Sequence, residues 1–184
     1  MGKAISSVGV ALLVKCWVKK TTDVSRDANK IYYELDSTNN VYVVASESTA
    51  VASLYEICAS NATGAVNQYT QITCLTDVPD IGGESDKIET TTLCDRQRTY
   101  IEGVLDAGES LDFSANYVHN VFVAIKTILL GNLYPCKIVF GGMAGGQGAF
   151  SLDGYIDARI GGFGVSEVIP MTISLTIASA ITYA

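Results

Sequence analysis

Strict alternation of apolar and polar residues is the feature that most constrains the fold of this chain. In residues 171–177, Met, Ile, Leu and Ile take every second position, and Thr, Ser and Thr lie between them. Residues 9–18 and 111–117 follow the same two-residue period. Successive side chains of a strand point to opposite faces, so this period predicts strands with one buried and one wet face. We expect a mainly β protein.

Shorter patterns extend this prediction. The β-prone runs 31–34 and 41–44 flank a Ser-Thr-Asn-Asn sequence at residues 37–40, which predicts a hairpin. Strand-like patterns also occupy residues 68–75, 134–140 and 148–156. Many short strands of this kind are typical of a β-sandwich or a β-barrel.

Two segments have helical periodicity instead. Between residues 118 and 130 the apolar positions hold helical spacing, with Val121, Phe122, Ile125 and Leu129 on one stripe, and Gly131 stands where a left-handed C-cap belongs. Ser48 is a candidate N-cap for a short helix whose apolar positions are Val51, Leu54, Tyr55 and Cys58. The expected fold is a β-sandwich or barrel of two sheets with one flanking α-helix, plus an inserted hairpin and short helix.

Composition excludes several classes of protein. The 184 residues are 48% hydrophobic and carry 12 Lys and Arg against 19 Asp and Glu, a formal charge of −7. A disordered chain has lower hydrophobicity, so this chain is expected to fold. A protein that reads nucleic-acid sequence needs clustered basic residues, and here Lys19 and Lys20 form the one adjacent pair. The apolar stretch 8–14 is too short to span a bilayer, and we expect neither a secretion signal nor membrane contact.

No catalytic constellation is expected. His119 is the single histidine, so a Ser-His-Asp triad or a histidine metal cluster would have to use it. We interpret it as a solvated residue at the start of the predicted helix. The glycine-rich residues 141–148 lack the Gly-Lys-Ser/Thr ending of a phosphate-binding loop and are interpreted as a hairpin turn. The chain is therefore expected to be no enzyme and to hold no cofactor.

No metal site is expected either. The acidic group Asp77, Asp80, Glu84 and Asp86 does not follow the spacing of a calcium-binding EF-hand loop. The cysteines are odd in number, scattered, and never in a Cys-x-x-Cys pair, so they indicate neither a disulfide framework nor zinc. We expect them to be small buried hydrophobic residues of a protein in a reducing cytoplasm: Cys16, Cys58, Cys74, Cys94 and Cys136.

The polar, glycine-punctuated residues 77–103 are the first functional candidate, because a compact domain keeps so long a segment only for a purpose. Residues 78–103 read VPDIGGESDKIETTTLCDRQRTYIEG. This sequence resembles the signature of the major tail, or tail tube, proteins of long-tailed bacteriophages. In that family Pro-x-Leu/Ile-Gly-Gly leads to an acidic residue, Thr-Thr-Leu, an Asp and Tyr-Ile-Pro-Gly. The resemblance continues through residues 111–117, the predicted helix and residues 164–176, covering about residues 69–180.

Two positions depart from the family pattern. Ser85 and Glu102 replace prolines, which loosens the segment without abolishing it. Residues from about 19 to 67 have no counterpart in shorter members of the family. We take them as an insertion on the outer wall of a tube, within a single domain of residues 1–184.

The resemblance implies two β-sheets with one helix, six copies in a ring, and stacked rings that form a hollow tube for DNA ejection into the host. It implies a long ring-stacking loop at residues 77–103, with contacts from Pro79, Asp80, Gly82, Gly83, Thr91, Thr92, Leu93, Asp95, Tyr100 and Gly103. A sheet face of Thr and Ser can line water, so the candidates for the lumen wall are Thr172, Ser174 and Thr176.

The same resemblance implies the partners and the location. The chain would contact other copies of itself and the tape-measure, tail-terminator and distal tail proteins. It would be assembled in the bacterial cytoplasm and reside in the virion tail. DNA would pass without specific binding, because an acidic surface repels it.

Other functions stay open at this point. The chain is also compatible with the tube of a contractile tail, of a phage-like bacteriocin or of a secretion system. From different classes, a carbohydrate-binding or adhesive β-sandwich would also be acidic and rich in threonine, and a small hydrolase would have to use His119. Tubes or rings in electron micrographs would separate the tail proteins from these alternatives.

Overall fold

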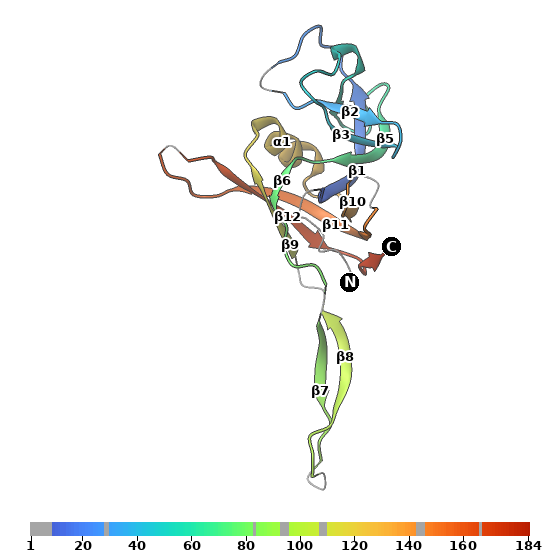
Figure 1. The fold of residues 1–184 in the computed structure, drawn as a ribbon, viewed down its shortest axis with the longest axis vertical. Helices are drawn as coiled ribbons and strands as arrows, with labels where there is room; N and C mark the ends of the chain where they lie inside the picture. Colours follow the sequence, from blue (N-terminus) through green and yellow to red (C-terminus); the bar gives the residue numbers. More distant parts are fainter. Residues whose placement is uncertain are drawn as a thin grey trace.

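The fold comes from a computed structural model. It describes residues 9–27, 30–82, 84–92, 96–106, 110–142, 146–165 and 167–184, and of residues 84–86 and 102–106 the backbone alone. The expectation of a mainly β fold with one helix is confirmed. The molecule has a body from which one hairpin projects as a long arm (Figure 1).

The body is built on an antiparallel sheet, and its strands confirm the alternating segments of the sequence. In order across the sheet these strands are β1 (Ala11–Lys20), β10 (Leu133–Val139), β11 (Ala149–Ile160), β12 (Pro170–Ile177), β9 (Ser110–Asn116) and β6 (Leu75–Asp77). The short β13 (Thr182–Tyr183) pairs with the start of β11. In β9 the two-residue period decides which face is buried, and Leu111, Phe113 and Ala115 are the buried residues.

Residues 19–67 extend this sheet into a closed cycle of strands. Their strands are β2 (Tyr33–Asp36), β3 (Val41–Val44) and β4 (Tyr55–Ile57), followed by β5 (Val66–Gln71). β1 pairs with β5 along one edge, and along the other edge with β10 at its start and β4 at its end. Because β4, β2, β3 and β5 are neighbours in that order, the five strands close on themselves. Figure 1 places this cycle at the end of the molecule opposite the arm.

The predicted hairpin is confirmed, with a first strand that begins two residues later than the β-prone run. Tyr33 pairs with Val44 and Asp36 with Val41. Asn40 has a φ of 53°, a left-handed conformation that asparagine tolerates better than most residues. The Asp36 carboxylate accepts hydrogen bonds from the backbone N–H of Thr38 and Asn39. This Asx geometry holds the turn.

The predicted helix is confirmed as α1 (His119–Ala124) followed by a π-helical turn (Ile125–Leu129). Val121, Ile125 and Leu129 are buried in the main core, which also contains Ile156 and Ile173 of the sheet. Phe122 is only partly buried, so the buried stripe is narrower than expected. Gly131 has a φ of +80°, as the left-handed C-cap requires.

The prediction of a short helix after Ser48 is wrong. A single 3-10 turn (Val51–Ser53) precedes β4, which pairs with the end of β1. Leu54 is fully buried, and Tyr55 and Ile57 pack partly buried against the main core. Aromatic and β-branched residues suit a half-buried sheet, and pairing with β1 overrides a helical spacing too short to nucleate a stable helix.

Residues 77–103 are not a loop along their whole length. After β6 the chain forms β7 (Glu84–Glu89) and β8 (Tyr100–Asp106), which pair with each other in a separate two-stranded sheet. We call residues 84–92 and 96–106 the arm. The arm leaves the body (Figure 1). Among the described strands, β7 and β8 form backbone hydrogen bonds only with each other.

Candidate assembly interfaces

The arm exposes apolar side chains along its length. Ile88 and Ile101 lie directly opposite each other on β7 and β8, with 52% and 55% of their surfaces exposed. Tyr100, next to Ile101, is about half exposed. An isolated two-stranded hairpin is marginally stable in water. Apolar side chains that stay exposed to water add no hydrophobic stabilisation to it, and a cluster of them marks an interaction site. The arm therefore has the properties of a segment that packs against another molecule.

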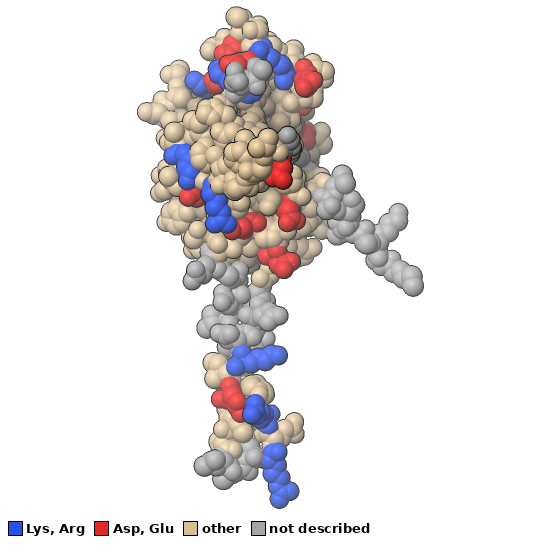
Figure 2. All heavy atoms as spheres, turned by 90° about the vertical axis from the view of Figure 1, so that its left-hand side faces the viewer, with Lys and Arg blue, Asp and Glu red and all other residues tan. Residues whose placement is uncertain are grey.

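Polar contacts hold the far part of the arm together. The backbone N–H of Thr90 donates to the carbonyl of Thr99 at 2.9 Å, and the N–H of Thr99 donates to the Thr91 hydroxyl at 3.1 Å. Arg98 lies 3.8 Å from Glu89. Figure 2 shows basic side chains along the arm, which are Lys87, Arg96 and Arg98. The arm is nevertheless acidic in sum, like the whole chain, because residues 84–106 hold six Asp and Glu against these three basic residues.

The ring-stacking residues expected from the sequence spread over this arm and its base. Pro79, Asp80 and Gly82 lie in the connection from β6 to β7, where Gly82 has a φ of +136°. Val78 and Ile81 of the same connection pack against the main core and anchor the base. Thr91 and Thr92 lie beyond β7, and Tyr100 and Gly103 belong to β8. Gly83, Leu93 and Asp95 fall outside the described residues.

The face of β12 expected to line the lumen is polar and points away from the core. Met171, Ile173 and Leu175 are fully buried, while Thr172, Ser174 and Thr176 alternate with them on the opposite face. The neighbours of these three residues in register on β9 and β11 are small, charged or, in one case, aromatic: Ser110, Asp112, Ser114, Tyr155, Asp157 and Arg159. The structure thus brings the polar faces of three strands together into one surface, which we call the polar face.

Hydrogen bonds and an ion pair fix the polar face. The Asp112 carboxylate accepts from the Ser174 hydroxyl and from the Arg159 guanidinium, each at 2.6 Å. Lys126 of the helix donates to Asp157 of β11 and lowers the pKa of that carboxyl. Arg159 and Lys126 balance acidic groups locally, so this surface is more nearly neutral than the composition implied.

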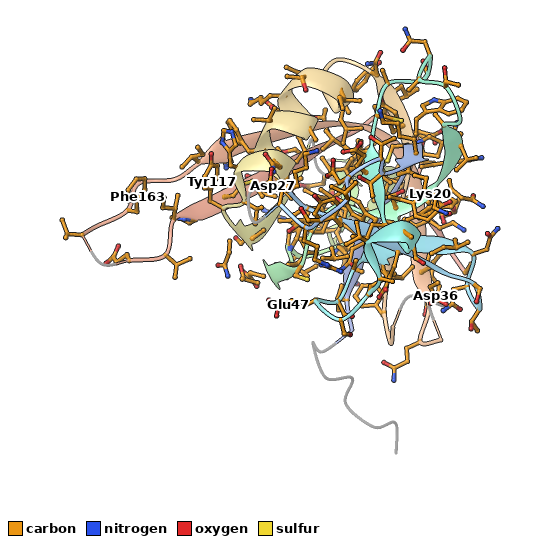
Figure 3. All side chains as sticks on the ribbon, turned by 90° about the horizontal axis from the view of Figure 1, so that it is seen from above. Lys20, Asp27, Asp36, Glu47, Tyr117 and Phe163 are labelled. Atoms are coloured by element: carbon orange, nitrogen blue, oxygen red, sulfur yellow. The ribbon has the colours of Figure 1, made fainter. Side chains whose placement is uncertain are left out.

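A second projection was missed by sequence reasoning. Residues 161–165 and 167–169, between β11 and β12, extend beyond the sheet, and we call them the tip. Phe163, Val165 and Val168 are 54%, 100% and 70% exposed. In Figure 3, Phe163 lies at one extremity of the molecule. The sequence signal that was available is a run of apolar residues among glycines 161, 162 and 164, where no strand alternation gives them a buried face.

The remaining candidates do not form a chemical site in the described part of the chain. His119 is exposed at the start of α1, and its Nδ1 lies 3.0 Å from the Tyr117 hydroxyl, which agrees with a solvated helix-end residue. Across the described ranges no three His, Cys, Asp or Glu side chains are arranged to hold a metal. Asp77 and Asp80 are exposed, and the side chains of Glu84 and Asp86 are not described. None of the described helices is long and apolar enough to cross a membrane.

The cysteine prediction is correct for three residues and wrong for a fourth. Cys16, Cys58 and Cys136 are buried, and burial raises the pKa of Cys16 and of Cys136 to about 12. Cys74 is exposed in the connection from β5 to β6, where the strand pattern of residues 68–75 breaks. Cys94 lies outside the described residues. Glycines 141, 142 and 148 have positive φ values and lie between β10 and β11, as a hairpin turn requires.

No family model and no curated protein matches the chain. A chain of the cryo-EM structure of the anti-feeding prophage (AFP) baseplate, 6-fold symmetrised, is similar in fold. The TM-score is 0.57 at 6% identity, over 100% of this chain and 97% of that chain. The chain shares the fold of a component of a phage-tail-like particle. At this identity the likeness concerns the fold.

Proposed function

We propose that this protein is a structural tail tube protein whose copies form six-membered rings that stack into a hollow tube for DNA. The tail tube signature of residues 78–103 gives the finer part of this proposal. The fold shared with a chain of the AFP baseplate, a particle treated as six-fold symmetric, supports the coarser part. The role is one of assembly, and we assign no chemical step to any residue.

The arm is the observation that carries the proposal. Its apolar pair Ile88 and Ile101 is exposed in the single chain, and its two strands lack the third strand or the packed face that would make them stable alone. A neighbouring subunit supplies such a face. The arm projects from one end of the body (Figure 1), and in the proposed tube it leaves its own ring and contacts the next one.

The polar face is the part of the surface best suited to the lumen. It consists of short hydroxyl side chains, locally balanced charges and the half-exposed Tyr155, and it exposes no cluster of basic residues. DNA binds proteins mainly through phosphate contacts with Lys and Arg, so such a wall lets DNA slide. The side chains on the opposite face of the same strands are buried in the main core, so that face is not available to line a channel.

Electron microscopy of the purified protein over a range of concentrations tests this function. We expect rings at intermediate concentration and tubes at high concentration. The double variant I88D/I101D removes the apolar pair of the arm and should prevent stacking without unfolding the body, because neither side chain belongs to the core. The matched control is Val24→Asp, at a residue that is 97% exposed in the cycle opposite the arm, and it should assemble normally.

Two results would contradict the proposal. A wild-type protein that stays monomeric at every concentration would favour a binding module, such as a carbohydrate-binding β-sandwich. Tubes formed equally well by I88D/I101D would remove the arm from the stacking contact. The circular dichroism melting temperature of each variant shows whether its body is folded.

A second candidate is favoured by one observation. The similar solved chain belongs to a baseplate, and this favours, as the second candidate, a ring at the end of a tail that does not repeat along it. Single rings that fail to stack at any concentration would favour this candidate over the tube. In such rings the arm would contact a different tail protein.

A further inference from the structure

The tip is apolar, exposed and placed where it can reach another molecule. Three of its described side chains, Phe163, Val165 and Val168, are more than half exposed within six residues. Single exposed apolar residues are common, but a cluster on a projecting turn is a sign of an interface. The charge of the tip comes from Glu167, whose carboxylate accepts a hydrogen bond from the N–H of Gly164 at 2.7 Å. Figure 2 views the body from this side and shows an uncharged area at its centre.

A hollow of about 450 Å³ lies on the face of the sheet that is turned away from the main core. Its floor is apolar and consists of Leu13, Val41, Val139 and Ala149. Its rim is polar and includes Thr38, Asn39, Asn40, Gln68, Tyr69 and Lys137. The Lys137 ammonium lies 4.8 Å from the centre of the Tyr69 ring. Within the described part of the chain, no carboxylate forms a salt bridge with Lys137.

The tip and the hollow lie at opposite ends of one strand. Ala149, in the floor of the hollow, is the first residue of β11, and the tip begins directly after Ile160, the last. A strand of this length spans about 36–40 Å at about 3.3 Å per residue. Figure 3 agrees, with Phe163 at one side of the molecule and Asp36, near the rim of the hollow, at the other. A contact between the two features must therefore join different copies head to tail.

We propose that the tip of one subunit inserts into the hollow of the next subunit in the ring, with Phe163 and Val165 over the apolar floor and Glu167 beside Lys137. This inference rests on the proposed function, because it names the lateral contact within a ring. Charge complementarity selects the occupant: the tip carries one negative charge and the hollow one positive charge without a carboxylate partner. A head-to-tail contact of this kind closes into a ring when the rotation between copies is suitable.

A charge exchange tests the pair. Glu167→Lys and Lys137→Glu should each raise the critical concentration for assembly by about tenfold or more, because like charges then face each other in every contact. The double variant E167K/K137E should restore it to within about twofold of wild type. Glu167→Gln and Lys137→Gln control for the lost local contacts with Gly164 and Tyr69. Single variants that assemble like wild type, or a double variant no better than either single variant, would overturn the contact.

Mixing of single-cysteine variants tests the geometry directly. In a background of C74S/C94S, one protein carries Val165→Cys in the tip and the other Thr38→Cys on the rim of the hollow. A short bis-maleimide should cross-link an equimolar mixture into heterodimers, while either protein alone should give none. The matched control replaces the tip variant with Val24→Cys, which is equally exposed and should not cross-link.

The outcomes separate the two proposals. Rings or tubes in micrographs without the tip-to-hollow cross-link would overturn this contact and leave the proposed function standing. Absence of any assembly together with absence of the cross-link would overturn both. A cross-linked head-to-tail dimer without rings or tubes would support the contact and contradict the proposed function.

Discussion

At the scale of single residues, burial decides which positions of the helix matter. Ile125 is 1% exposed in the main core, so Ile125→Ala should lower the free energy of unfolding by about 2–5 kcal/mol. Replacing a fully buried phenylalanine by alanine lowers the free energy of unfolding by about 3–5 kcal/mol. Phe122 is partly exposed, so Phe122→Ala should lower it by less than this. Urea unfolding measures both losses.

His119→Ala is the control for the same helix. His119 is exposed, so this change should shift the free energy of unfolding by no more than about 0.5 kcal/mol and leave assembly intact. Failure to assemble at normal stability would assign His119 a role in an interface. A loss for Phe122→Ala as large as that for Ile125→Ala would show that the ring is buried more deeply than the structure has it.

The buried thiols make a second prediction at this scale. Burial raises the pKa of Cys16 and Cys136 from 9.0 to about 12, so the folded state holds these protons more tightly than the unfolded state. The stabilisation that comes from these two protonated thiols is therefore fully present below pH 9. As the pH rises from 9 toward 12, the free energy of unfolding falls by up to about 1.4 kcal/mol per pH unit for each thiol. Urea midpoints at pH 8 and pH 10 measure the slope.

The variant Cys16→Ala isolates one of these thiols. It should be less stable than wild type at pH 8 but lose less stability between pH 8 and pH 10. An identical slope for wild type and variant would mean that Cys16 does not titrate in this way. Alkylation at pH 8 adds an independent readout, since exposed Cys74 should react much faster than Cys16 or Cys136.

At the scale of elements, the arm is expected to change its protection on assembly. Its two strands have no neighbour in the single chain beyond each other, so their amides should exchange quickly in monomers. In tubes the apolar pair is covered and exchange should slow. Hydrogen exchange with mass spectrometry measures both states, with β12 as an internal standard that is protected in each. Equal exchange of the arm in monomers and tubes would contradict a role in ring stacking.

At the scale of the whole molecule, the polar face is expected to set how DNA moves. Thr176 is exposed on this face, and Thr176→Lys would add a phosphate contact in every subunit of every ring. Tubes should form, but DNA ejection from virions carrying the variant should slow or stop at low salt and recover at high salt. Val24→Lys places the same charge on the exposed cycle of strands and should leave ejection unchanged. Normal ejection by the Thr176 variant at low salt would exclude this face from the lumen.

Local periodicity was enough to predict much of the fold. β9, β12 and the helix were found from the sequence because their buried faces recur at two-residue or helical spacing. The hairpin of β2 and β3 was found because a polar turn separates two β-prone runs. These signals lie within a few residues of one another. They do not depend on which other part of the chain supplies the partner surface.

The predictions that were wrong concern features that depend on contacts between residues far apart in the sequence. β4 was mistaken for a helix because its strand state depends on the end of β1, more than thirty residues away. The arm was expected to be a loop because β7 and β8 bury no common face and show no clear alternation. Cys74 was expected to be buried, but the strand ends before it.

The sequence by itself determined the buried faces of β9 and β12, the hairpin of β2 and β3, and the position of the helix. It also carried the family signature on which the proposed tube function rests. The tertiary structure alone decided which exposed apolar residues stand on projections. Ile88 and Ile101 read in the sequence like any other apolar residues, and the apolar run among glycines 161, 162 and 164 does not by itself show that Phe163 and Val165 project. Their exposure follows from where the sheet ends, and this depends on long-range pairing that local patterns do not encode.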